Sequence, residues 1–443
     1  MNKINNKAIS VTVIGAGLAG AEAVYQLIRR QIPVRLIEMR PKVNTGAHTS
    51  DQFAELVCSN SVGSNLPDRA SGLLKEELRM LGSYFMEVAY KYRVPAGNAL
   101  AVDRGAFSRE ITRYLRGHSL VDFINEEAVE IPEDGLVIVA TGPLTSPALL
   151  KQLQNVLGKK QLEFYDAVAP LLSTDTINMN IAFKADRYGE TGKGDYINCP
   201  MNKEQYLDFI KALLEAERID LSEMEISARK KFFSACQPVE IIAESGVDSL
   251  RFGPMKPVGL TDPKTGKRPY AAVQLRQDNL LASLYNMVGF QTNLKHAEQQ
   301  RVFRMIPGLE NAEFIRLGQM HRNSYINSPE LLGPTLQLRN NSRIMFAGQL
   351  CGVEGYTESA ATGLVAGFNA ARIIQGKEPL VFPPQTMIGC LLNYISFAGH
   401  KDFHPMNANF GIFTAEEGTK GDVRKEQIIR QARRCFREFF DQL

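Results

Sequence analysis

A glycine-rich turn near the N-terminus constrains the fold of this chain more than any other feature. The apolar residues 11–14 lead directly into residues 15–20, whose sequence is Gly-Ala-Gly-Leu-Ala-Gly. In a strand–turn–helix unit of this kind, the first glycine makes the tight turn, the second lets a pyrophosphate reach the backbone, and the third lets the helix pack on the strand. The N-terminus of that helix then offers N–H groups and the positive end of its dipole to phosphate oxygens.

An acidic residue in the expected place makes this motif specific. A helix-like segment follows the turn as far as Arg30, and a second strand-like run, residues 34–38, ends in a glutamate. Glu38 follows Gly20 by 18 residues, a spacing that suits a carboxylate accepting hydrogen bonds from a ribose hydroxyl. A glycine motif alone is weak evidence, but the complete order of strand, turn, helix, strand and acid predicts that this segment binds an adenine dinucleotide.

Two later segments have the pattern of additional dinucleotide contacts. The apolar run 135–139 continues into Ala-Thr-Gly at residues 140–142. Residues 343–355 form a third piece, in which Gln349 takes the place of the usual acidic residue, and a helix rich in small residues is expected at 358–374. A domain that binds only NAD needs the first piece alone, so three pieces at opposite ends of the chain predict FAD. The residues expected to bind it are Gly15, Ala16, Gly17, Leu18, Ala19, Gly20, Glu38, Thr141, Gly142, Gly348 and Gly352.

The pattern of elements predicts an α/β fold with an insertion. With 443 residues the chain exceeds one ordinary core. We expect a Rossmann-like FAD-binding domain of the two-dinucleotide-fold flavoprotein type, formed discontinuously by residues 1–165 and 331–443. Residues 166–330 are expected to form an inserted α+β domain, with strands around 177–183 and a helix at 203–217.

Composition narrows the class of protein further. The net charge of +3 is too small to favour or exclude a nucleic-acid partner. The six cysteines include no Cys-x-x-Cys pair and no His/Cys grouping typical of a metal site, so we expect no metal. No stretch approaches the roughly 18 apolar residues of a membrane span, and no signal peptide is expected. These features predict a reduced, cytoplasmic protein.

Two cysteines are candidates for chemistry. Cys58 lies where an apolar run breaks into small polar residues, and Cys236 follows Lys230 and Lys231 and precedes a proline. The thiolate is the reactive form of cysteine, and nearby cations favour it. The alternative for either residue is inert packing, which is common for cysteine.

Basic residues supply candidate contacts to a polyanion. The C-terminal helix-like segment, residues 424–440, places arginines beside an apolar stripe, which fits either a solvated helix face or a contact to RNA phosphates. The candidate cations are Lys256, Lys264, Lys267, Arg268, Arg276, His321, Arg322, Arg430, Arg433, Arg434 and Arg437.

Beyond these separate motifs, nearly the whole chain resembles the folate- and FAD-dependent tRNA uracil-5 methyltransferases, the TrmFO family. Two blocks depart from the family pattern. Residues 235–240 read Ala-Cys-Gln-Pro-Val-Glu instead of Gly-Cys-Met-Pro-Ile-Glu, and residues 289–296 end in Asn-Leu-Lys-His instead of His-Leu-Lys-Trp. The blocks that carry the resemblance are residues 13–20, 38–41, 53–61, 94–97, 101–104, 140–145, 252–260, 320–323 and 405–411.

The resemblance implies an activity, its cofactors and its partners. The expected reaction forms 5-methyluridine in the T-arm of tRNA, with 5,10-methylenetetrahydrofolate as carbon donor and NAD(P)H-reduced FAD as reductant. Both family cysteines are present, as Cys58 and Cys236. We expect Cys236 to attack C6 of uracil, which activates C5, and Cys58 to remove the C5 proton or to position the base.

Several alternatives remain open from the sequence. The same chemistry can act on ribosomal RNA, since contacts to phosphates carry no sequence information. A related flavoprotein modifies the wobble uridine of tRNA, but it has a longer chain with a helical C-terminal domain. A generic NAD(P)H–flavin oxidoreductase would leave the cysteine blocks without a role. A third alternative is a flavin-bound RNA-binding or folding factor without turnover, and nothing in the sequence excludes chaperone activity alongside catalysis. The sequence does not fix the oligomeric state, the choice between NADH and NADPH, or which of the two thiols attacks C6.

Overall fold

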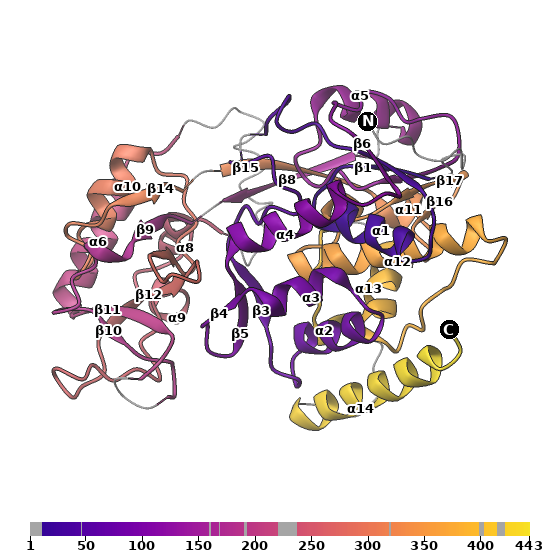
Figure 1. Cartoon of the computed structure of the whole chain (residues 1–443). Coiled ribbons are helices and arrows are strands. Elements are labelled where there is room, and N and C mark those ends of the chain that lie inside the picture. Colours follow the sequence, from indigo (N-terminus) through magenta and orange to yellow (C-terminus); the bar gives the residue numbers. More distant parts are fainter. Residues whose placement is uncertain are drawn as a thin grey trace.

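The computed structural model describes most of the chain and divides into two parts, each with its own sheet (Figure 1). Described are residues 11–45, 47–158, 161–167, 169–189, 193–219, 237–318, 320–397, 403–413 and 421–443, of which residues 161–167, 320–322 and 421–422 are described by their backbone alone.

The first part is built on a six-stranded sheet of order β16-β17-β7-β1-β2-β6, in which all pairs but β16–β17 are parallel. A parallel sheet that reverses its order beside β1 places the carboxyl ends of β1 and β7 together, where doubly wound folds bind ligands. The strands are β1 (Val11–Ile14), β2 (Val34–Ile37), β6 (Val121–Ile124), β7 (Leu136–Val139), β16 (Gln337–Leu338) and β17 (Asn341–Phe346).

Helices and a small antiparallel sheet complete this first part. The three-stranded sheet has the order β3-β5-β4 and lies close to α2 and α3 in the fold. Its elements are β3 (Ser61–Ser64), β4 (Arg93–Val94), β5 (Ala99–Val102), α1 (Leu18–Ile28), α2 (Ala70–Met80), α3 (Tyr84–Lys91), α4 (Arg104–Arg116), α5 (Pro147–Leu157), α11 (Ser328–Leu331), α12 (Tyr356–Ile374), α13 (Met387–Phe397) and α14 (Gly421–Phe440).

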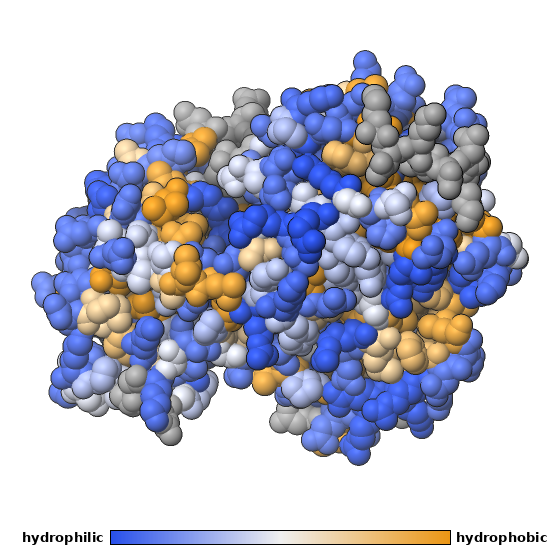
Figure 2. All heavy atoms as spheres, in the orientation of Figure 1, coloured by the Kyte–Doolittle hydropathy of each residue, from blue (hydrophilic) through white to orange (hydrophobic). Residues whose placement is uncertain are grey.

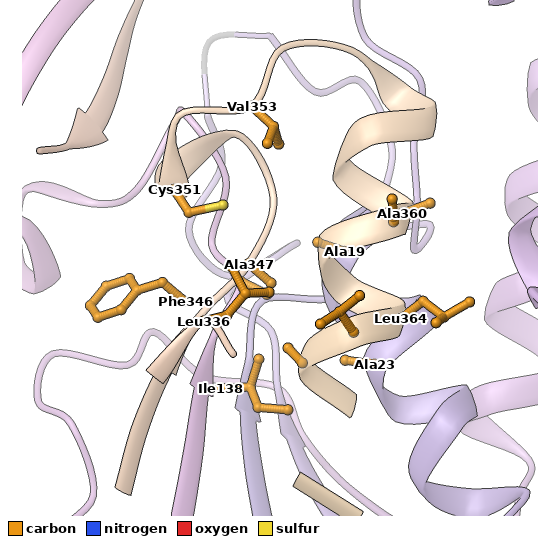
Figure 3. Packing of buried hydrophobic residues seen from close by; sticks show 14 of the residues in the cluster. Ala19, Ala23, Ile138, Leu336, Phe346, Ala347, Cys351, Val353, Ala360 and Leu364 are labelled. Carbon is orange, nitrogen blue, oxygen red and sulfur yellow. The ribbon is translucent and has the colours of Figure 1, made fainter. Parts of the chain in front are cut away.

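Close packing of α1 against α12 joins the two ends of the chain. A Cβ atom at Gly363 would lie 2.2 Å from the carbonyl oxygen of Ala19, and one at Gly367 would lie 2.5 Å from that of Ala23. Ala19 and Ala23 face the part of α12 that carries Leu364 (Figure 3). Small residues on both helices therefore let the C-terminal half complete the domain that the N-terminal half begins.

The second part contains the insertion. Its six-stranded antiparallel sheet has the order β10-β11-β12-β13-β9-β14 and forms a separate hydrophobic core with its helices. The chain enters through β8 (Gln161–Ala167) and returns through β15 (Met320–Ile326), which pair with each other. The elements of this part are β9 (Leu171–Ser173), β10 (Phe183–Lys184), β11 (Tyr196–Met201), α6 (Lys203–Glu215), α8 (Val239–Glu244), α9 (Ser249–Phe252), β12 (Ala271–Gln277), β13 (Leu284–Met287), α10 (His296–Phe303) and β14 (Phe314–Arg316).

One strand prediction was wrong. Residues 177–182 form turns, and only β10 at the end of the expected strand is extended. The reason is the side chain of Asn178, which accepts a hydrogen bond from the Asn180 N–H at 3.0 Å, while its carbonyl accepts from Ile181 and Ala182. An asparagine of this kind stabilises a turn and competes with a strand.

The hydropathy of the surface and of the helices fits a protein with two buried cores. On the face drawn in Figure 2, hydrophilic residues predominate and hydrophobic residues form smaller separate patches. Within the described ranges, no helix has the length and apolar content that crossing a membrane requires.

Candidate active site

The glycine-rich turn leaves an open position for a phosphate. Gly15 has a φ of +97°, and a Cβ atom there would lie 2.6 Å from the carbonyl oxygen of Ala140. A Cβ atom at Gly20 would lie 1.8 Å from the carbonyl oxygen of Gly15, so the helix start requires glycine. At Gly17 a Cβ atom would meet nothing within 4 Å, so ligand atoms can approach this backbone.

Glu38 stands beside this turn with part of its capacity as an acceptor already used. Its Oε2 accepts the Ala16 N–H at 2.8 Å, and its Oε1 accepts from the backbone and side chain of Arg40, both at 3.0 Å. Burial opposes ionisation, but the Arg40 charge and these hydrogen bonds outweigh it and hold the pKa of Glu38 below its usual value. A carboxylate has about four acceptor positions, and these three contacts leave about one of them for a ribose hydroxyl.

Two adjoining cavities extend from this turn. The first, of about 60 Å³, is lined by Gly15, Gly17, Glu38 and Thr141, among others. The second, of about 390 Å³, is lined by Cys58, and Leu144 lines both. An elongated ligand with a nucleotide at one end and a large ring at the other fits this arrangement. The open Gly17 and the ionised Glu38 meet the needs of its pyrophosphate and ribose.

Not every expected cofactor residue reaches these cavities. Gly348 has a φ of +78° and packs near Ala19, and Gly352 has a φ of +84° and packs against the ring of Phe403. Their neighbour Gln349 lines the second cavity instead. Ala16 donates its N–H to Glu38, Ala19 is buried, and Gly20 packs against Gly15. Leu18 packs against the hydrophobic core, and Gly142, with a φ of +70°, has open space where a side chain would lie.

The Cys58 loop is held by a residue from the far end of the sequence. The Oη atom of Tyr356, the first residue of α12, accepts the N–H of Cys58 at 2.9 Å and the N–H of Ser59 at 3.1 Å. Tyr356 also lines the second cavity. Burial and the nearby Cys58 raise the pKa of Tyr356, so the phenol stays protonated and neutral at physiological pH.

A buried polar network joins this loop to the insertion. Arg104 of α4 binds Asp278 through two hydrogen bonds of 2.6 and 2.9 Å. Asn60 donates to the carbonyl of Gln277 at 2.7 Å and accepts from the Arg276 side chain at 3.0 Å. The loop that carries Cys58 therefore lies at the contact between the two parts of the molecule.

Other predicted residues either lie outside the described part of the chain or have a different environment from the one expected. Cys236, with Lys230 and Lys231, lies outside the described residues. The prediction that Arg276 contacts a polyanion was wrong, because this side chain is only 8% exposed and is bonded within the network. The C-terminal helix α14 uses Arg433 to bind Glu76 at 2.8 Å.

Sequence reasoning missed the residues that hold the Cys58 loop. Tyr356 lies about 300 positions from Cys58 and Asp278 lies 174 positions from Arg104, so no local spacing relates them. The one local signal was at Arg104, a charged residue followed by Gly-Ala, whereas Asp278 stands between Gln277 and Asn279 and has no such signal.

The fold and the cavities define a dinucleotide-binding α/β protein of the flavoprotein type. A family model described as Glucose inhibited division protein A matches residues 10–378. The structure of Aquifex aeolicus GidA aligns with 97% of this chain and 73% of its own, with a TM-score of 0.69 and 17% identity, which supports the fold alone. The expected fold class is confirmed.

Curated relatives identify the family more closely. A protein from Desulforudis audaxviator, named methylenetetrahydrofolate–tRNA-(uracil-5-)-methyltransferase TrmFO, is 54% identical over 425 residues, which cover 96% of each chain. A protein of the same name from Enterococcus faecalis is 55% identical over 403 residues, which cover 91% of this chain and 92% of the relative. The chain belongs to the glucose inhibited division protein A family and, within it, to the TrmFO family.

Proposed function

We propose that this protein methylates C5 of uracil in tRNA, with 5,10-methylenetetrahydrofolate as carbon donor, FAD as cofactor and NAD(P)H as the source of electrons. The observation that supports this most is the cavity of about 390 Å³ whose wall carries Cys58 and which adjoins the nucleotide-binding turn. Relatives that match 96% of this chain carry this activity in their names.

The cofactor is held by the residues that surround the two cavities. The open backbone at Gly17 would receive the pyrophosphate, and Glu38 would accept a hydrogen bond from a ribose hydroxyl. Thr141 and Gln349 lie along the route to the second cavity. When bound, FAD supplies the reducing electrons that convert the transferred methylene group to methyl.

The two cysteines divide the covalent chemistry. The Cys236 thiolate adds to C6 of uracil: the S–C6 bond forms, the electron pair of the C5=C6 bond moves toward O4, and C5 becomes nucleophilic. Cys58 removes the C5 proton or positions the base after the carbon is attached, and elimination then breaks the S–C6 bond. The position of Cys58 in the cavity wall supports a place for it beside the reacting base.

The substrate is the T-arm of tRNA. Its target uracil must leave the stack to enter the cavity, which costs a few kcal/mol and is offset by contacts to the backbone. We also propose a cytoplasmic location for the protein.

Nucleoside mass spectrometry tests the proposal. Purified protein, which should be yellow, is incubated with NAD(P)H, labelled methylenetetrahydrofolate and either tRNA or ribosomal RNA in separate reactions. We expect labelled 5-methyluridine from tRNA. Label from S-adenosylmethionine instead, methylation of ribosomal RNA alone, or a modified wobble uridine would each contradict the proposal.

A further inference from the structure

The loop that carries Cys58 is fixed at three successive peptide groups by side chains from distant segments. Arg104 of α4 donates to the Leu56 carbonyl at 3.2 Å, and Arg316 of β14 donates to the Val57 carbonyl, also at 3.2 Å. Tyr356 then accepts the N–H groups of the next two residues. Only Arg316 among these three side chains comes from the insertion.

Arg316 has hydrogen-bonding groups that this contact does not use. Its Nη1 atom binds the Val57 carbonyl, while its Nε and Nη2 atoms are fully buried and have no partner among the described residues. Buried N–H groups of a charged side chain that lack partners are costly. This guanidinium therefore retains charge and hydrogen-bonding capacity beyond its contact with the Val57 carbonyl.

The charges around the loop are unbalanced. Arg104, Arg276 and Arg316 all lie close enough to Cys58 for it to influence their pKa values, and Asp278 is the carboxylate among the groups that act on Arg316. Asp278 is already bound by Arg104. Burial, reinforced by the Arg104 charge, lowers the pKa of Arg316 to about 10, so it still carries its charge at neutral pH.

We propose that Arg316 is a positioning residue for the methyl-transfer reaction, which holds the Cys58 thiol in place through the Val57 carbonyl and supplies positive charge behind the loop that forms part of the cavity wall. The inference rests on the proposed function. Addition of a thiolate at C6 moves the C5=C6 electron pair toward O4, so negative charge develops within the cavity. Arg316 requires no contact with substrate for this role, because the field of a poorly solvated charge reaches across several ångströms.

Steady-state kinetics of FAD-loaded enzyme test the role of Arg316. The variants are Arg316→Met, which removes the charge and the hydrogen bond, and Arg316→Lys, which keeps the charge and one donor. Arg301→Met is the matched control, because this arginine lies in the same insertion, is 50% exposed and pairs with Glu298. The readouts are FAD content, reduction of bound FAD by NAD(P)H, and kcat and KM for methylation of tRNA.

We expect Arg316→Met to keep FAD and its reduction but to lower kcat by roughly ten- to hundred-fold, as small errors in positioning do. KM for tRNA should change little, Arg316→Lys should recover part of kcat, and Arg301→Met should match the unmodified enzyme. If Arg316→Met fails to retain FAD, Arg316→Gln replaces it in the experiment. We again expect its kcat to be lower than that of Arg316→Lys.

Other results would overturn the inference. A kcat within about two-fold of the unmodified enzyme would remove the positioning role, and a raised KM for tRNA with unchanged kcat would make Arg316 a contact to RNA instead. An Arg316→Lys variant no better than Arg316→Met would contradict the role of the charge. Failure of the unmodified enzyme to form 5-methyluridine would instead contradict the proposed function, so the two failures are distinguishable.

Discussion

At the scale of single residues, two side chains line the two adjoining cavities of the candidate site. Glu38 lines the cavity beside the glycine-rich turn, and Cys58 lines the larger cavity beyond Leu144. Glu38 is a fixed, ionised hydrogen-bond acceptor, and Cys58 is a thiol on a loop whose backbone is held by hydrogen bonds. Substitution of Glu38 therefore tests the binding of the cofactor, and substitution of Cys58 tests the chemistry.

Cys58→Ala should retain FAD and lose methylation. The backbone of the Cys58 loop is held by its peptide groups, so loss of the thiol leaves the cavity wall in place. Loss of proton transfer at C5 lowers turnover by about 10²-fold or more. The measurement is 5-methyluridine formation beside the flavin spectrum. A covalent adduct with 5-fluorouridine-substituted tRNA should persist in Cys58→Ala and vanish in Cys236→Ala; the reverse result would exchange the two roles.

Glu38→Gln should weaken FAD binding and alter the dependence of stability on pH. The pKa of Glu38 is held below its usual value, so its contribution to stability is present above the unfolded-state pKa and is lost as pH falls through the lower folded-state pKa. The variant leaves the buried Arg40 with only its longer ionic contact to Glu55 at 3.3 Å, at a cost of about 1–3 kcal/mol near neutral pH. Denaturant unfolding at several pH values should show the difference shrinking in acid. A difference in unfolding free energy between the variant and the unmodified protein that stayed constant down to the lowest pH would contradict this account.

At the scale of elements, the sequence predicted what depends on neighbouring residues. The turn at residues 15–20 is specified by glycines at fixed spacing, and β1, β2, β7 and α12 lie close to their expected positions. Local turn chemistry also explains the failure at residues 177–182, where Asn178 ended a run that looked extended. The packing of α1 on α12 was not predictable, because the two helices lie more than 300 residues apart in the chain.

Gly363→Ala should destabilise the protein through the contact of these helices. The new Cβ atom would meet backbone atoms of Ala19 at 2.2 and 2.7 Å, which only a shift of α1 or α12 can relieve. Overpacking of this kind costs about 1–3 kcal/mol, and a displaced α1 also loosens the phosphate-binding turn. Thermal unfolding and FAD affinity measure both effects.

Gly105→Ala is the matched control for that change. Its new Cβ atom would meet only the flexible end of Arg109 at 2.9 Å, so we expect stability to be unchanged or slightly raised. Equal losses in both variants would indicate a general cost of replacing glycine and would contradict the packing argument.

At the scale of the whole molecule, the candidate site is completed where the two parts meet. Each part has its own hydrophobic core, yet the Cys58 loop binds Arg316 and Arg276 of the insertion directly or through Asn60. Sequence analysis could not predict these contacts, because they depend on how two sheets, each with its own hydrophobic pattern, pack against each other. The residues that local sequence patterns indicated least therefore contribute most to holding the Cys58 thiol in place.

Asp278→Ala should loosen this contact between the two parts. Arg104 and Asp278 have side chains only 12% and 5% exposed, so loss of the carboxylate leaves a buried guanidinium without its partner and costs roughly 3–5 kcal/mol. Asp248→Ala is the control, because Asp248 pairs with Arg251 while 52% exposed and its loss should cost less than about 1 kcal/mol. Hydrogen exchange should increase together in residues 53–60 and 277–286 of Asp278→Ala and in neither segment of the control. If the first variant lost stability without faster exchange in both segments, the pair would stabilise the insertion alone and would not couple it to the Cys58 loop.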